Sequence, residues 1–236
     1  YHRLGRIDLD DLNWSRGYER WPAYARSKLA NLLFTHELDA RLRAEMRTEI
    51  LRLHREISAT IIYVTHDQVE AMTMSSRLAV MDKAKAVQVD RPKKIFMLPR
   101  NQTVATFIGT PAMNIIPAAI VSEQGGPAVR FLGGQFRIDP RHHEKLKGID
   151  RVDAGIRPQA LRLVPPTPGK ITGKVFLREP LGLEDEVIVQ ASDGTRVKIV
   201  TGSNEEFPEG SEVSLDFNAK DLYLFHAESK ETLCFG

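Results

Sequence analysis

The sequence lacks the features that would assign it to a secreted, membrane-spanning or nucleic-acid-binding class. It contains one cysteine, Cys234, so no internal disulfide can form, and this fits a reducing compartment. No apolar run approaches the roughly 20 residues that a helix needs to cross a bilayer, and no secretory signal is visible. The net charge is only +2 and there is no basic stripe. We therefore expect no nucleic-acid partner, and any membrane association through another protein.

The sequence also lacks the Gly-x-x-x-x-Gly-Lys-Ser/Thr loop with which many nucleotide-binding proteins hold phosphate groups. It begins with Tyr1 rather than methionine, which leaves open whether upstream sequence with such a loop is missing. What the chain does contain is ordinary for a globular protein, with 42% hydrophobic and 27% charged residues. Its 236 residues suit one or two domains, and we expect two.

The most informative segment is Ile62-Tyr-Val-Thr-His-Asp-Gln-Val-Glu-Ala-Met-Thr73. The apolar run Ile61 to Val64 predicts a strand buried on both faces, and Asp67 with Glu70 has the spacing of a helix capping box. The pattern thus predicts a strand that delivers His66 to the start of a helix, where the helix N-terminus favours an anion. The alternative is an ordinary histidine at the end of a strand.

This segment resembles the switch-histidine segment of ABC transporter ATPases, in the branch that imports maltose and glycerol phosphate. The resemblance implies that His66 contacts the γ-phosphate of ATP and helps to align the attacking water. It implies ATP and Mg²⁺ as cofactors, with permease subunits and a second ATPase subunit as partners. It further implies a homodimer formed through the C-terminal domain, and a cytoplasmic location at the inner membrane. The run Leu38-Asp-Ala-Arg-Leu-Arg43 resembles the loop after the catalytic glutamate, in which Asp39 reaches across the dimer.

Other parts of that family's nucleotide site are not found in the chain. The Asp-Glu pair expected before Leu38 is replaced by Leu33-Phe-Thr-His-Glu37. Leu132-Gly-Gly-Gln135 echoes the signature loop, but its neighbours predict a hairpin turn. Leu78-Ala-Val-Met-Asp82 imitates the magnesium-binding strand, yet Lys83 follows it, so we expect a strand that runs into a turn. Whether the chain is an enzyme stays open, and we expect it not to bind or hydrolyse ATP alone.

A second resemblance covers residues 1–37. Trp21-Pro-Ala-Tyr-Ala-Arg-Ser-Lys28 resembles the active-site helix of short-chain dehydrogenases, with Tyr24 and Lys28 as its Tyr-x-x-x-Lys pair. On a helix these two side chains share one face, so the ammonium group can lower the pKa of the phenol. No glycine-rich dinucleotide turn precedes the pair. We therefore expect Tyr24 and Lys28 to be inactive relics of a fusion that joins the two likenesses near residues 36–44.

The rest of the pattern predicts the fold. Apolar residues spaced by three and four from Leu38 to Ile57 predict an amphipathic helix. Beyond His66 we expect a hairpin around residues 82–85 and two short helices, Pro92 to Leu98 and Gln102 to Ile108. After residue 114 short β segments predict a small barrel or sandwich. These segments are 115–121, 129–132, 135–138, 152–156, 171–177, 186–190, 196–200, 212–217 and 222–225.

The order of phrases after residue 112, among them Gly155-Ile-Arg-Pro158, resembles the OB-like regulatory domain of sugar-importer ATPases. The expected fold class is an α/β remnant of a P-loop-type sheet followed by a mostly β, OB-like domain. The expected domains are residues 1–37, 38–111 and 112–236. Three functions stay open: the C-terminal part of an importer ATPase, a non-catalytic dimerisation or regulatory module, and an NAD(P)-dependent oxidoreductase remnant.

Overall fold

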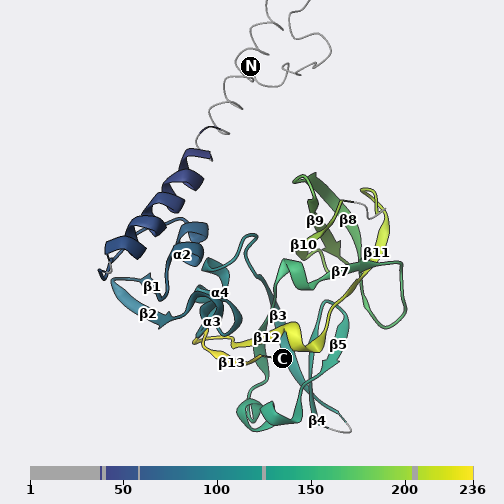
Figure 1. The fold of residues 1–236 in the computed structure, drawn as a ribbon. Helices are drawn as coiled ribbons and strands as arrows, with labels where there is room; N and C mark the ends of the chain where they lie inside the picture. Colours follow the sequence, from purple (N-terminus) through teal and green to yellow (C-terminus); the bar gives the residue numbers. More distant parts are fainter. Residues whose placement is uncertain (1–37, 39–40, 58, 124–125, 204–206, 236) are drawn as a thin grey trace, which may run out of the picture. The chain divides into compact units, whose positions relative to one another are not determined.

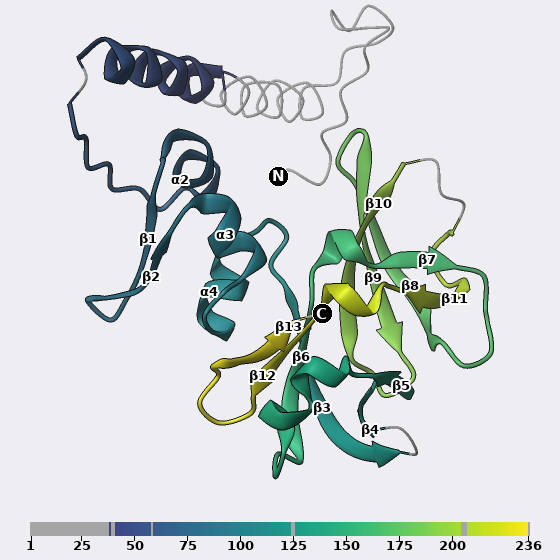
Figure 2. The ribbon, with the colours of Figure 1, turned by 60° about the horizontal axis from the view of Figure 1, so that its bottom comes forward.

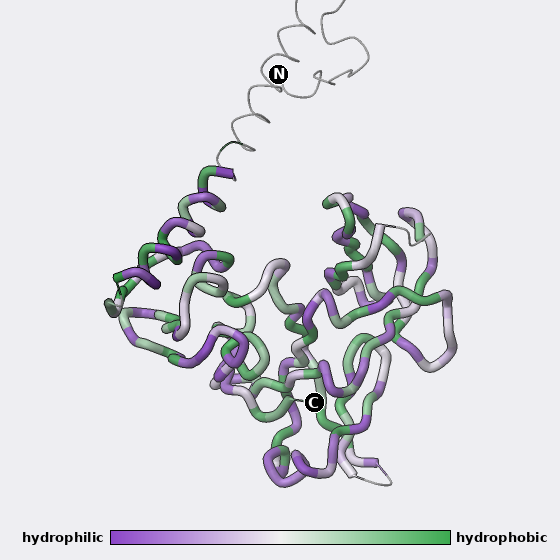
Figure 3. Tube along the Cα trace, viewed as in Figure 1, coloured by the Kyte–Doolittle hydropathy of each residue, from purple (hydrophilic) through white to green (hydrophobic). Residues whose placement is uncertain are grey.

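The computed structural model describes residues 38, 41–57, 59–123, 126–203 and 207–235. The chain divides into two compact units, residues 1–66 and residues 67–236, and each is considered by itself. In the first unit residues 41–57 are helical, as the apolar spacing predicts (Figure 1). Figure 3 shows hydrophobic and hydrophilic residues alternating along this helix. Its apolar side chains are exposed, Met46 at 60% and Leu53 at 52%.

The strand predicted at Ile61 to Val64 is not formed. Residues 61–65 are neither helix nor strand, and Ile62 and Val64 are 89% and 91% exposed. An inner strand of a parallel sheet needs a hydrogen-bonded neighbour on each side. The described part of the chain supplies no neighbouring strand, so the apolar run does not become a strand. The described residues therefore do not show the expected α/β remnant, since every strand pairing among them is antiparallel.

The second unit begins with a small helical layer beside a hairpin. Its elements are α2 (Gln68–Met74), β1 (Leu78–Asp82), β2 (Lys85–Asp90), α3 (Pro92–Met97) and α4 (Gln102–Phe107). The hairpin and both predicted short helices are confirmed, and Asn101 caps α4 by accepting a hydrogen bond from the Val104 amide at 3.0 Å. Val80, Ile95, Val104 and Ile108 are buried together as the core of this layer.

The remainder of the unit consists of two antiparallel sheets (Figure 2). The five-stranded sheet has the order β10-β9-β8-β11-β7 and the six-stranded sheet the order β13-β12-β6-β3-β4-β5. The strands are β3 (Asn114–Glu123), β4 (Gly126–Phe131), β5 (Gly134–Arg137), β6 (Arg151–Ile156), β7 (Arg162–Val164), β8 (Ile171–Pro180), β9 (Glu184–Ala191), β10 (Arg196–Gly202), β11 (Glu212–Asp216), β12 (Leu222–His226) and β13 (Thr232–Phe235). Three short 3-10 helices lie between them: η2 (Pro140–Leu146), η3 (Pro158–Ala160) and η4 (Ala219–Asp221). The predicted β-rich domain is therefore confirmed.

One hydrophobic core joins the two sheets. Buried side chains alternate with exposed ones along β9 and β10, so that Val187, Val189, Val197 and Ile199 face inward. They share a cluster with side chains of the six-stranded sheet such as Leu224. Alternation of this kind is typical of sheets that pack on one face. Asp185 of β9 is the charged exception, 3% exposed and paired with Arg178.

Arg157 attaches the helical layer to the β-rich part. Its guanidinium donates hydrogen bonds to the Ile108 carbonyl at 2.8 Å and the Phe96 carbonyl at 2.5 Å, and its carbon Cζ lies 3.7 Å from the centroid of the Phe96 ring. Gly109 fits closely against this group, because a Cβ at that position would lie 2.7 Å from the guanidinium Nη1. The Tyr223 hydroxyl adds a hydrogen bond to the Met97 carbonyl at 3.0 Å. These contacts make the helices and the sheets one packed unit.

In the described part of the chain, no helix has both the length and the apolar character that crossing a bilayer requires.

Candidate functional site

His66 lies immediately before helix α2, as the sequence predicts, but it sits on a bend and is exposed. The helix start itself is well defined. Asp67 is the N-cap, and its Oδ1 accepts hydrogen bonds from the amides of Val69 at 2.7 Å and Glu70 at 3.1 Å. The predicted cap is thus confirmed. Because the Asp67 carboxylate already occupies these two amides, the helix start does not offer them to an external phosphate.

Gln68, the first residue of α2, links this helix to the segment that leads into the β-rich part. Its Oε1 accepts a hydrogen bond from the Gly109 amide at 2.8 Å and lies 3.4 Å from the Thr110 hydroxyl. Residues near Thr110 are in turn held by the Gln159 amide, which donates to the Thr110 carbonyl at 3.1 Å. A shift of α2 would therefore be transmitted to the start of β3 through hydrogen bonds rather than through loose loop contacts.

Asn114 connects the two sheets of the β-rich part. Its Nδ2 donates to the carbonyls of Ile156 at 3.2 Å and Lys198 at 2.8 Å, while its Oδ1 accepts from the Lys198 amide at 2.8 Å. The side chain is 9% exposed, so these bonds satisfy a nearly buried amide. Sequence reasoning did not identify Gln68 or Asn114, because their partners lie far away in the sequence.

The residues present do not make a complete nucleotide site. The chain has no phosphate-binding loop in its sequence, and the N-terminal amides of α2 are bonded to Asp67. An exposed imidazole can donate to a phosphate oxygen only when other groups already hold that phosphate. We therefore derive no hydrolytic step for His66 in this chain.

The other predicted site residues cannot be placed. Asp39, Tyr24 and Lys28 lie outside the described residues. Within the described ranges no group of three or more His, Cys, Asp or Glu side chains is arranged as a metal site. Two segments that imitate ATPase motifs adopt the predicted turns instead. Leu132 and Gly133 form the turn between β4 and β5, and the strand Leu78–Asp82 runs directly into the β1–β2 turn.

Two family models match the β-rich part. Residues 109–161 match the MalK OB fold domain, and residues 154–225 match the TOBE domain. The two matches overlap at residues 154–161 and together span residues 109–225, which contain the strands from β3 into β12 but not β13.

Curated relatives extend the similarity to about four fifths of the chain. The maltose/maltodextrin import ATP-binding protein MalK of Aliivibrio fischeri is 36% identical over 82% of this chain and 53% of its own length. The xylose/arabinose import ATP-binding protein XacK of Haloferax volcanii is 35% identical, over 83% and 51%. The sn-glycerol-3-phosphate import ATP-binding protein UgpC 1 of Rhizobium johnstonii is 36% identical, over 81% and 51%. The chain thus spans about half the length of the curated relatives it matches.

The family models locate the similarity in the β-rich part, and the relatives extend it to most of the chain. The OB and TOBE matches include most strands of the two sheets, and the three relatives named above are import ATP-binding proteins. The chain is therefore similar to the C-terminal portion of MalK-type ATP-binding proteins of ABC importers.

Proposed function

We propose that the chain serves as the C-terminal portion of an ATP-binding subunit of an ABC-type importer for a sugar or for glycerol phosphate. The observation that carries the proposal is the consecutive match of residues 109–161 and 154–225 to the MalK OB fold and TOBE domains. The substrate class is taken from the names of the three relatives, which are import proteins for maltose or maltodextrin, xylose or arabinose, and sn-glycerol 3-phosphate.

In this proposal residues 38–111 derive from the end of an ATPase domain, and residues 112–236 form the regulatory domain. The subunit would work beside permease subunits and a second ATP-binding subunit, on the cytoplasmic side of a membrane. The hydrogen bonds that Gln68 accepts from Gly109 and Thr110 support a mechanical role for α2, because they join the start of this helix to the segment that leads into β3. A nucleotide bound by other parts of the assembled importer would then affect the β-rich part through α2 and these hydrogen bonds.

ATP and Mg²⁺ would then belong to the assembled importer rather than to this chain alone. His66 would supply a hydrogen-bond donor, and Asp39 a carboxylate at the partner subunit, as the family resemblance implies. Neither residue can hold a triphosphate by itself. The chain on its own is therefore expected to act as a binding and regulatory module.

The regulatory-module function predicts self-association through the β-rich part. Sedimentation velocity of the full chain over a concentration series is expected to show a reversible monomer–dimer equilibrium. The helix of residues 41–57 offers a competing route, because its apolar side chains are exposed. Replacing Leu42 and Met46 by glutamate removes that route, so the dimer should persist in this variant. A chain that stays monomeric, or a dimer abolished by L42E/M46E, would overturn the proposal that the β-rich part forms the dimer.

The dehydrogenase-like segment remains a separate prediction. We propose that residues 1–37 are a relic without oxidoreductase activity, because no dinucleotide-binding turn accompanies Tyr24 and Lys28 in the sequence. Titration with NADPH, followed by its fluorescence, is expected to show no saturable change. A saturable change that disappears in Tyr24→Phe would instead favour the oxidoreductase function.

A further inference from the structure

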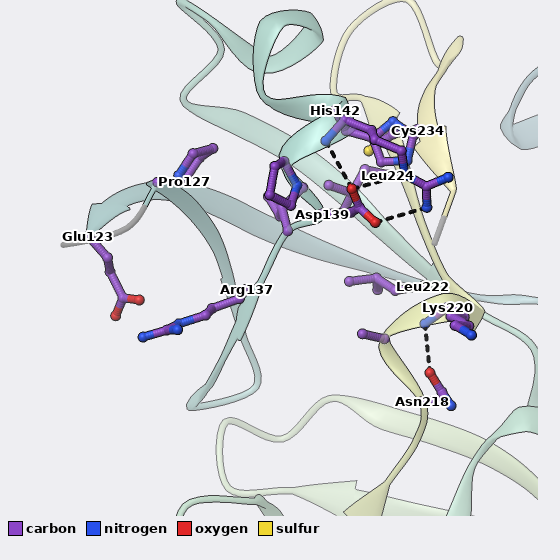
Figure 4. A pocket seen from close by; sticks show the side chains of 15 residues that line it. Glu123, Pro127, Arg137, Asp139, His142, Asn218, Lys220, Leu222, Leu224 and Cys234 are labelled. Carbon is purple, nitrogen blue, oxygen red and sulfur yellow. Dashed lines mark hydrogen bonds and ion pairs between the residues drawn. The ribbon is translucent and has the colours of Figure 1, made fainter.

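A pocket of about 500 Å³ lies in the β-rich part, at a place that the proposed function does not use. Figure 4 shows the side chains that line it. They come from the ends of β3, β4 and β5, from η2, from η4 and from strands β12 and β13. The lining residues are Glu123, Gly126, Pro127, Arg137, Ile138, Asp139, Pro140, Arg141, His142, Asn218, Ala219, Lys220, Leu222, Leu224 and Cys234.

One wall of the pocket is apolar and firmly built. Leu224 is 1% exposed and Cys234 4%, and both belong to the core that joins the two sheets. Leu222 and Ile138, at 6% and 8%, extend the same wall. Leu222, Leu224 and Cys234 are held by strands β12 and β13, so the wall exists without a ligand. An apolar group that covered it would gain free energy by removing this surface from water.

The rim is charged, and its charges are not balanced. Asp139 is paired with Arg141, whose guanidinium lies 2.8 Å from it. The hydrogen bonds from Arg141 lower the pKa of Asp139 to about 2, so this carboxylate stays ionised and neutralises Arg141. Glu123 accepts a hydrogen bond from the Gln135 amide. Arg137 and Lys220 are exposed cations with no ion pair among the described residues.

A buried donor or acceptor completes the site. The Nε2 atom of His142 is buried and has no hydrogen-bond partner among the described residues. In Figure 4, Arg137 and Glu123 stand across the opening from Asn218 and Lys220. The pocket therefore offers an apolar wall and two cations on opposite sides of its mouth. Among the described residues these cations form no ion pair, and the imidazole nitrogen has no hydrogen-bond partner.

We propose that this pocket binds a small organic anion, with a phosphate or carboxylate head at Arg137 and Lys220 and an apolar body on the β12–β13 wall. The two cations attract the head, and the wall accepts a body that a hydrated inorganic ion lacks. The site belongs to the regulatory part alone and rests on the pocket, not on the proposed transport function. Its occupation would brace η2 and η4 against strands β12 and β13, since all four contribute to its lining.

The test is calorimetric titration of the full chain with hexyl phosphate and with hexanoate. Hexanol and hexylamine serve as probes with the same body and a neutral or cationic head. Saturable one-to-one binding of at least one anion is expected, weakened by added salt, with hexanol and hexylamine clearly weaker. No saturable binding of either anion, or equal binding of hexanol, would overturn the proposal. Because no nucleotide, permease or second subunit is needed, failure here is distinct from failure of the proposed function.

Three variants locate the bound anion. Replacing Arg137 and Lys220 by glutamine is expected to weaken binding about tenfold or more, since two charge-assisted contacts are lost. Arg130→Gln with Arg151→Gln removes the same charge from exposed positions outside the pocket and should leave the affinity within about twofold, because screened distant charges act weakly. Ala219→Phe fills the pocket mouth at an exposed position and should abolish binding while circular dichroism stays unchanged. Equal affinities in the two charge variants would contradict the proposal.

Discussion

At the scale of single residues, Arg157 carries much of the contact between the helices and the sheets. It is 6% exposed, and its hydrogen bonds end on two backbone carbonyls of the helical layer rather than on a carboxylate. Burial lowers its pKa from the ordinary value, which reflects the desolvation of a cation held mainly by carbonyls and an aromatic ring. A buried cation in this setting has a structural role.

Arg157→Met is expected to lower the free energy of unfolding by about 2–4 kcal/mol, because two carbonyls lose their buried donor. Urea denaturation followed by circular dichroism measures the loss, and hydrogen exchange should place it in α3 and α4. Arg162→Met is the matched control, since Arg162 is exposed on β7 and its replacement should change stability by no more than about 0.5 kcal/mol. Equal effects of the two substitutions would contradict the role assigned to Arg157.

Cys234 illustrates how burial controls the chemistry of one side chain. Desolvation raises the pKa of this thiol from 9.0 to about 11. At pH 8 the thiolate fraction should therefore be about 100-fold lower in the folded chain than in the unfolded chain. Reaction with a chromogenic disulfide reagent is expected to be at least that much slower in buffer than in urea. Comparable rates in buffer and in urea would show that the thiol is accessible to the reagent and has its ordinary pKa.

The same shift has a consequence for stability. A pKa that is raised in the folded state stabilises the fold below about pH 9 and loses this effect as the pH rises towards 11. Cys234→Ala should therefore reduce the decline of the unfolding free energy between these pH values. If the unfolding free energy of the variant declined as much as before, the decline would be due to other titrating groups.

At the scale of elements, the β1–β2 turn is built from residues that suit it poorly. Lys83 and Ala84 both have positive φ, 46° and 60°, in a two-residue hairpin loop. This conformation is costly for residues with a Cβ, and glycine adopts it readily. The hairpin sequence Asp82-Lys-Ala-Lys85 contains no glycine. The positive φ angles show that two residues with a Cβ adopt a conformation that favours glycine.

Ala84→Gly is expected to raise the free energy of unfolding by about 0.5–1 kcal/mol. Ala86→Gly, on the adjoining strand β2, is the matched control and should lower it by a similar amount, because glycine weakens a strand. Thermal and urea denaturation of both variants gives the comparison. A loss of stability in Ala84→Gly equal to that in Ala86→Gly would show that the turn is not strained.

The elements also show what sequence reasoning could and could not reach. Alternation along β9 and β10, the cap at Asn101 and the turn at Leu132 were predictable because each is a local pattern. Strands β7 and β13, of 3 and 4 residues, were not among the predicted segments. The strand predicted at Ile61 to Val64 was wrong, because strand formation depends on neighbouring strands that the run itself does not encode.

The long-range contacts of the candidate site were beyond prediction for the same reason. Gln68 meets Gly109 across 41 positions of sequence, and Asn114 meets Lys198 across 84. Neither pair has a local signal. Gly155-Ile-Arg-Pro158 was noticed as a family phrase, yet only the fold shows that its arginine holds two helices. His66 was found because its neighbours in sequence are informative.

At the scale of the whole molecule, the chain joins a histidine segment typical of ABC ATPases to a β-rich part that matches the MalK OB and TOBE domains. The histidine is exposed and the helix after it is capped internally, while the β-rich part is packed and connected to that helix. The described residues thus include a β-rich part similar to the MalK OB and TOBE domains, and they do not form a complete nucleotide site. We expect the chain to act by self-association and by binding a ligand.

The most direct test of this account is equilibrium titration of the purified full chain with ATP in the presence of Mg²⁺. We expect no saturable binding and no phosphate release, because the chain contains no phosphate-binding loop and Asp67 occupies the start of α2. A micromolar, magnesium-dependent affinity with turnover that is lost in His66→Ala would contradict it.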